Sequence, residues 1–190
     1  RRDFIKQIST AGIVLGTSSF PYDSFAKGNV VKITVLHTND VHSHIDPFPR
    51  NDPKYPGQGG VAQRMAIINR IREEEKNVLL FDAGDIFQGT PYFNLYKGEP
   101  EIKAMSAMKY DATTIGNHDF DAGMENLATQ LMKHANFPML VSNYDFTGTP
   151  MENKTQPYKI FKKGKLKIGV FGVSIEGKGL IPDSLFGTTK

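Results

Sequence analysis

ATTIGNHDFD, at residues 112–121, joins a short apolar run to a cluster of polar side chains. The apolar part, 112–115, predicts a short β-strand, and the polar part follows where that strand ends. Asn117 offers a neutral oxygen ligand for a metal ion, and His118 can donate to a substrate oxygen. Asp121, about one helical turn later, can orient the imidazole. The segment predicts an acid–base site; the alternative is a helix N-terminus capped by an Asn or Asp, with an incidental histidine.

Two upstream segments show the same arrangement of an apolar run followed by polar groups. The run 78–81 ends in Asp82 and Asp85, and the run 30–36 ends near Asp40 and His42. In open α/β sheets, ligands bind beyond the carboxyl ends of the strands. Each of these motifs alone is also compatible with an ordinary polar turn.

The side chains of these two segments are assigned different tasks. In extended backbone, residues i and i+2 face the same side, so Asp40 and His42 are expected to reach one metal ion. Asp85 stands after a glycine, which allows close approach to a ligand, and its carboxylate can bridge two ions. Asp82 lies nearer the strand and is expected either to support a ligand without touching the metal or to be structural.

Helix-spaced apolar residues lie between the predicted strands. They predict helices at 60–76, 101–109 and 124–135. Further strands are expected at 138–141 and within 160–174, the latter as a hairpin turning at Lys163-Gly164. Alternating strands and helices predict an α/β fold with parallel strand segments, and the length suits one domain.

Composition restricts the partners and the metal ligands. The chain has 190 residues, a net charge of +3 and no cysteine, so a metal site must use His, Asp, Asn or other oxygen ligands. Residues 1–27 account for +2 of that charge and leave +1 for the remainder. The nearly neutral remainder gives no reason to expect a nucleic-acid polymer as partner.

Residues 1–27 resemble an export signal of the twin-arginine type. Arg1 and Arg2 precede a short apolar stretch at 8–15, which is too short to span a bilayer. We expect cleavage before Gly28, a periplasmic or otherwise exported protein, and no stable membrane anchor. The alternative is an amphipathic helix with two solvated arginines.

Four blocks in this order resemble the 5′-nucleotidase branch of the calcineurin-like metallophosphoesterases. They are LHTNDVH at 36–42, GGVA at 59–62, DAGDIFQG at 82–89 and GNHDFD at 116–121. The resemblance runs from about residue 32 to residue 181. It implies a four-layer αββα sandwich, of which residues 28–190 would form the N-terminal part of the catalytic domain.

The resemblance also implies two divalent metal ions, which zinc, manganese or iron could supply. Asp40 and His42 would bind one ion, Asp85 would bridge both, and Asn117 would bind the second. His118 and Asp121 would form the catalytic dyad. The implied reaction is hydrolysis of a nucleoside monophosphate, or another small phosphoester, by a hydroxide formed on the metal ions.

The resemblance predicts that the site extends beyond these 190 residues. In the family, further histidines come from later strand ends, and a C-terminal domain holds the nucleotide base. No substrate-binding residue is assigned here, and His44 is not assigned as a ligand. The isolated chain is therefore expected to be a poor enzyme.

Three alternatives accompany this interpretation. A thiosulfohydrolase-like relative is disfavoured because such proteins depart from Asn-His at the position of Asn117 and His118. A repair nuclease shares the metal core, but the export signal disagrees with its compartment. A non-catalytic binding module is disfavoured because all the front-half site residues are present.

Overall fold

A computed structural model describes residues 30–190, and the compact unit that contains the predicted site spans Ile33–Lys190. The predicted export signal at 1–27 lies outside the described residues. Within 30–190, none of the helices has the length and apolar character that crossing a membrane requires.

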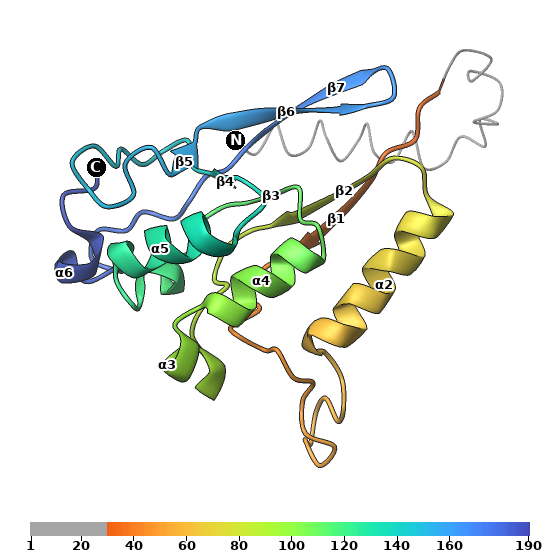
Figure 1. The fold of residues 1–190 in the computed structure, drawn as a ribbon, viewed down its shortest axis with the longest axis horizontal. Helices are drawn as coiled ribbons and strands as arrows, with labels where there is room; N and C mark the ends of the chain where they lie inside the picture. The colour runs from red at the N-terminus through yellow and green to blue at the C-terminus, as the bar shows by residue number, and fades with distance from the viewer. Residues whose placement is uncertain (1–29) are drawn as a thin grey trace, which may run out of the picture. The chain divides into compact units, whose positions relative to one another are not determined.

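A five-stranded parallel sheet forms the centre of this unit (Figure 1). Its strands follow chain order: β1 (Thr34–Thr38), β2 (Val78–Asp82), β3 (Ala112–Thr113), β4 (Met139–Leu140) and β5 (Thr155–Gln156). Thr38 pairs with Asp82, and Asp82 pairs with Thr113. The loops after β1, β2 and β3 therefore leave the sheet at one edge, as the sequence predicted.

Helices cover one face of the sheet. They are α2 (Gly60–Glu74), α3 (Pro91–Tyr96), α4 (Glu99–Ala107) and α5 (Met124–His134), with the short η2 (His118–Phe120) and α6 (Asp183–Phe186). Leu80 from the sheet, Ile102 from α4 and Leu127 from α5 belong to one buried core cluster. Burial of this apolar surface holds the helices on the sheet.

A hairpin covers the other face of the sheet. β6 (Tyr158–Lys163) and β7 (Leu166–Phe171) pair antiparallel around the predicted turn. Phe161 of β6 packs with Leu79 and Leu140 of the sheet in a second core cluster. Helices, parallel sheet and hairpin are thus stacked in that order (Figure 1). The α/β prediction is confirmed, and the described residues contribute the N-terminal portion of the expected sandwich.

The element boundaries differ from the sequence prediction in places. The first strand begins at Thr34 rather than at residue 30, and the third contains only two residues. α3, α6 and β5 were not predicted, because segments of two to six residues are too short to show a hydrophobic period. Helix α4 starts earlier than expected, with Pro100 in its first turn, where proline is tolerated.

Candidate metal centre

The loops that follow β1 and β2 continue to pair after the strands end. The backbone N–H of Asp40 donates to the carbonyl of Gly84 at 3.0 Å. The N–H of His42 donates to Asp85 at 3.1 Å, and that of Ser43 to Ile86 at 3.0 Å. These hydrogen bonds place the two candidate ligand loops side by side.

The expectation that extended backbone aligns Asp40 with His42 is wrong. Asp40, His42 and Asp85 have φ values of 51°, 44° and 55°, in the left-handed region that residues other than glycine rarely adopt. The cross-loop hydrogen bonds hold this unfavourable backbone in place. A tight turn, not strand alternation, therefore brings the side chains together.

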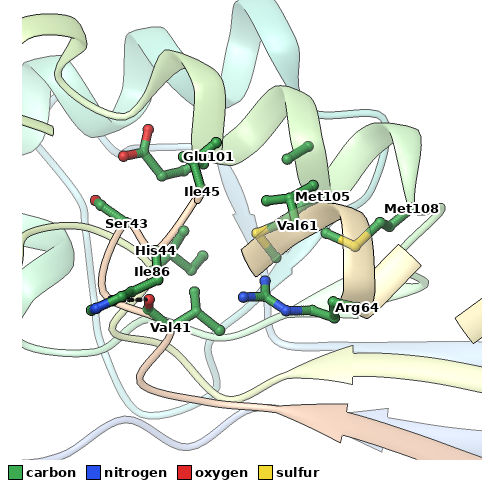
Figure 2. A pocket seen from close by; sticks show the side chains of 11 residues that line it. Val41, Ser43, His44, Ile45, Val61, Arg64, Ile86, Glu101, Met105 and Met108 are labelled. Carbon is green, nitrogen blue, oxygen red and sulfur yellow. Dashed lines mark hydrogen bonds between the residues drawn. The ribbon is translucent and has the colours of Figure 1, made fainter. Parts of the chain in front are cut away.

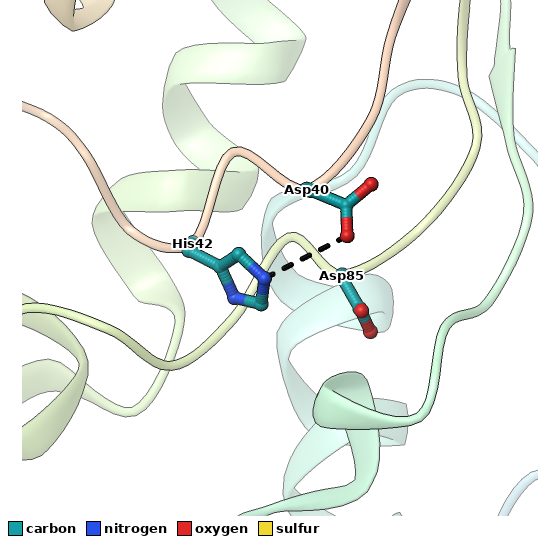
Figure 3. Close-up of side chains that lie close together, drawn as sticks. All are labelled: Asp40, His42 and Asp85. Carbon is teal, nitrogen blue, oxygen red and sulfur yellow. Dashed lines mark ion pairs between the residues drawn. The ribbon is translucent and has the colours of Figure 1, made fainter.

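The ligand atoms of Asp40, His42 and Asp85 all lie within 4.8 Å of one another (Figure 3). His42 Nε2 is 3.8 Å from Asp40 Oδ1. His42 Nδ1 lies 3.2 Å from the carbonyl oxygen of Phe87, which can only accept, so Nδ1 carries the proton. In the neutral ring, Nε2 then presents a lone pair to the carboxylate, an arrangement that a cation between them would stabilise.

Imidazole and carboxylate donors therefore converge in a small space. Such mixed nitrogen and oxygen donors fit a divalent transition metal. The residues present are compatible with the metal that the sequence analysis predicted, and the tautomer of His42 is the one that metal binding by Nε2 requires.

Glycines allow the loops to approach this closely. A Cβ atom on Gly116 would lie 2.2 Å from Asp85 Oδ1, and one on Gly84 would lie 2.5 Å from the backbone nitrogen of Gly116. A Cβ atom on Gly89 would lie 2.8 Å from the carbonyl oxygen of His42. Any larger residue would push the candidate ligands apart.

The loop after β3 adds His118 to the cluster. Its backbone N–H donates to Asp85 Oδ1 at 2.9 Å, and its ring meets that of His42 edge to face at 5.2 Å. His118 Nδ1 lies 2.9 Å from Asp121 Oδ2. The hydrogen bond to Asp121 raises the pKa of His118, although partial burial opposes the rise.

Asn117 is half-buried and immediately precedes this histidine at the start of η2. Its side chain makes no capping hydrogen bond there, contrary to the alternative interpretation of the segment as a capped helix end. The structure thus gathers Asp40, His42, Asp85 and His118, with Asp121 bonded to His118 and Asn117 next to it in the chain. Their roles as ligands and catalytic groups stay predictions.

Asp119, the acidic residue that follows His118, has a structural role that was not predicted. It is 1% exposed, and its carboxylate accepts backbone N–H groups from the loop after β2 and from the loop after β3. The donors are Gly116 at 2.8 Å, Ile86 at 2.8 Å, Asp85 at 3.1 Å and Phe87 at 3.2 Å. Burial raises its pKa to about 7. The one sequence signal for this role is an acidic residue beside a core aromatic, Phe120.

Asp82 and His44 hold the surrounding loops through hydrogen bonds. Asp82 is buried and accepts hydrogen bonds from the Thr38 hydroxyl and the Gly84 N–H, as predicted, and burial raises its pKa to about 6. His44 Nδ1 lies 3.0 Å from the carbonyl oxygen of His42, and its ring packs on Phe48. His44 therefore stabilises the turn through its Nδ1 atom.

Comparison with known proteins gives one family and several relatives. The family described as calcineurin-like phosphoesterase matches residues 33–177. A snake venom 5′-nucleotidase from Crotalus adamanteus is 44% identical over 147 residues, which make up 74% of this chain and 25% of the relative. The chain thus spans about a quarter of the length of the curated relatives it matches.

Solved structures agree with this relationship. A 5′-nucleotidase precursor from Thermus thermophilus superimposes with a TM-score of 0.69 and 36% identity, over 75% of this chain and 28% of that one. A sulfate thiohydrolase from a Thermus species has a TM-score of 0.66 over 86% of this chain and 40% of its own. Its identity of 18% means that it shares the fold alone.

Proposed function

We propose, from the premise that this chain belongs to the calcineurin-like phosphoesterase family, that it carries the front part of a metal-dependent 5′-nucleotidase active site. The reaction is hydrolysis of a nucleoside monophosphate to nucleoside and phosphate. The observation that carries the proposal is the convergence of Asp40, His42 and Asp85 within 4.8 Å, with the His118 ring beside them. The relatives named 5′-nucleotidase support the choice of reaction.

In this proposal, Asp40 and His42 hold one divalent ion, Asp85 is shared by two, and Asn117 holds the second. Zinc, manganese or iron would suit these donors. When bound, the ions would supply Lewis-acid stabilisation of phosphoryl oxygens and lower the pKa of water. The protein's part is to fix the donors, which Gly84, Gly116 and the carboxylate of Asp119 support.

His118 is proposed as the acid–base or charge-stabilising group. The Asp121 carboxylate accepts from Nδ1, so Nε2 is the nitrogen left to give a proton to a phosphoryl or leaving oxygen. By raising the pKa of His118, Asp121 favours the protonated ring that such a donor needs. The two residues thus form a dyad in which Asp121 positions and charges the histidine.

We further propose that protein beyond these 190 residues completes the site and recognises the nucleotide. The support is that the matched relatives are about four times longer than the matched region. The thiosulfohydrolase alternative receives only a likeness of fold. Nucleotide sugars and cyclic nucleotides are the alternative substrates.

Metal removal tests the reaction. Full-length protein assayed with adenosine 5′-monophosphate should lose phosphate release after dialysis against a chelator and regain it when zinc or manganese is returned. Asp40→Ala protein should stay inactive after the same metal addition. Phosphate release that survives complete chelation, or no release from any nucleotide by metal-loaded protein, would contradict the proposal.

We also propose that residues 1–27 direct export by the folded-protein route, with the mature protein in the periplasm. The Arg1-Arg2 pair and the short apolar stretch carry this proposal. Replacing both arginines by lysine should retain the protein in the cytoplasm of fractionated cells. Replacing Lys6 by arginine serves as the control, and unchanged export of the double-lysine variant would refute the route.

A further inference from the structure

A small cavity lies behind the loop that carries His42. Its volume is ≈ 10 Å³, and it is lined by side chains of the 41–45 turn, α2 and α4, with Ile86 and Met108 (Figure 2). Most of its lining is apolar: Val41, Ile45, Val61, Ile86, Met105 and Met108. Ser43 and Glu101 lie beside each other at one end of it, and Arg64 lies at the other (Figure 2).

Ser43 and Glu101 are deeply buried and polar. Ser43 is 1% exposed and Glu101 is 3% exposed. Among residues 30–190, neither the Ser43 hydroxyl nor either carboxylate oxygen of Glu101 has a hydrogen-bond partner. Buried polar groups without partners are costly, so their retention in a mostly apolar pocket calls for an additional ligand.

Both backbone hydrogen-bonding groups of Ser43 already have partners. Its N–H donates to the carbonyl of Ile86 at 3.0 Å, and its own carbonyl accepts from the Thr90 hydroxyl at 2.8 Å. Only the side-chain hydroxyl is left to interact with Glu101. Burial raises the pKa of Glu101, and hydrogen bonding by the Ser43 hydroxyl and by the Glu101 backbone opposes that rise. The hydroxyl and the carboxylate thus lie near each other, although their geometry falls short of a direct hydrogen bond.

The size and chemistry of the cavity select its occupant. A volume of ≈ 10 Å³ is about the space that one water molecule needs, and the three unpartnered oxygen atoms match the two to four partners of a buried water. A metal cation would need more oxygen ligands than this apolar lining offers. A single water is therefore the ligand that the site fits.

We propose that Ser43 and Glu101, bridged by one bound water molecule, form a polar site that holds the 41–45 turn and thereby positions His42. The turn needs such support because His42 and Ser43 both have left-handed backbone, with φ values of 44° and 56°. Both residues act through His42 and are positioning residues. The link to metal affinity rests on the proposed function, whereas the link to the order of the turn does not.

Hydrogen exchange in metal-free protein tests the order of the turn. The amides of His42 and Ser43 should exchange about tenfold faster in Ser43→Ala and in Glu101→Met, because either change leaves a buried polar group unpaired. Glu101→Gln keeps an oxygen acceptor, so in this variant the two amides should exchange as slowly as in the unaltered protein. Glu99→Met changes a half-exposed glutamate in the same helical turn and should have no effect.

Manganese binding, measured by calorimetry, tests the consequence for the metal. Ser43→Ala and Glu101→Met should each weaken binding by about 10–100-fold. The double variant should be no weaker than the weaker single variant, because the two residues act as one unit. Glu101→Gln and Glu99→Met should bind manganese as the unaltered protein does.

Three further results would contradict the proposal in whole or in part. Unchanged exchange at His42 and Ser43 in both single variants would overturn it, as would equally faster exchange throughout β2, which indicates general destabilisation. A crystal structure with Ser43 bonded directly to Glu101 would rule out the water. If unaltered protein binds no manganese but the variants still loosen the turn, the proposed function fails and the positioning role stands.

Discussion

Replacing His118 with asparagine should lower turnover by about 10²–10⁴-fold and leave the metal content nearly unchanged. The imidazole is held by Asp121 at 2.9 Å and lies beside the His42 ring, but it is not among the clustered ligand atoms of Asp40, His42 and Asp85. Asparagine keeps the backbone N–H that donates to Asp85 and removes only the proton-donating ring. The rate of the chemical step should therefore fall while the protein keeps its metal.

The measurement pairs turnover of a nucleoside monophosphate with elemental analysis of the same full-length preparation. His134→Asn is the matched control, because His134 ends α5 and its ring has no part in the cluster. Asp121→Asn should lower turnover less than His118→Asn, since it weakens only the orientation and charge of the ring. A His118→Asn protein that has lost its metal would show that His118 is a ligand and would overturn the assigned role.

Much of the site could be predicted from the sequence because its residues stand at strand ends. Parallel strands deliver their following loops to one edge of the sheet, so the loops after β1, β2 and β3 meet without any knowledge of tertiary detail. Helical periodicity similarly identified α2, α4 and α5 to within two residues at each boundary. These features depend on neighbours in the chain, which a sequence displays directly.

The features that escaped prediction depend on partners remote in sequence. The left-handed turn at Asp40 and His42 is held by carbonyls of residues 84 and 85, and no local pattern reveals those bonds. Asp119 reads as a helix cap, yet its carboxylate joins two loops more than thirty residues apart. Glu101 was predicted only as the first residue of a helix, and its burial against the 41–45 turn follows from no pattern among its neighbours in the chain.

The same close packing should make Gly116→Ala disruptive to the site. A Cβ atom there would lie 2.2 Å from Asp85 Oδ1 and 2.4 Å from its backbone nitrogen, so Asp85 must move. Displacing a catalytic group by about 1 Å can cost about 100-fold in rate. Full-length Gly116→Ala protein should therefore lose at least that much phosphate release and should bind manganese weakly. Overpacking should also lower the free energy of unfolding by about 1–3 kcal/mol.

Gly169→Ala is the control that isolates this steric effect. Neither glycine has a positive φ, so alanine strains neither backbone, and a Cβ atom on Gly169 of β7 meets nothing within 4 Å. Gly169→Ala should keep activity, manganese affinity and stability. Calorimetry and urea unfolding of both variants make the comparison. If Gly116→Ala binds manganese like the unaltered protein, Asp85 can leave its observed position without consequence, and its assignment as the shared ligand is wrong.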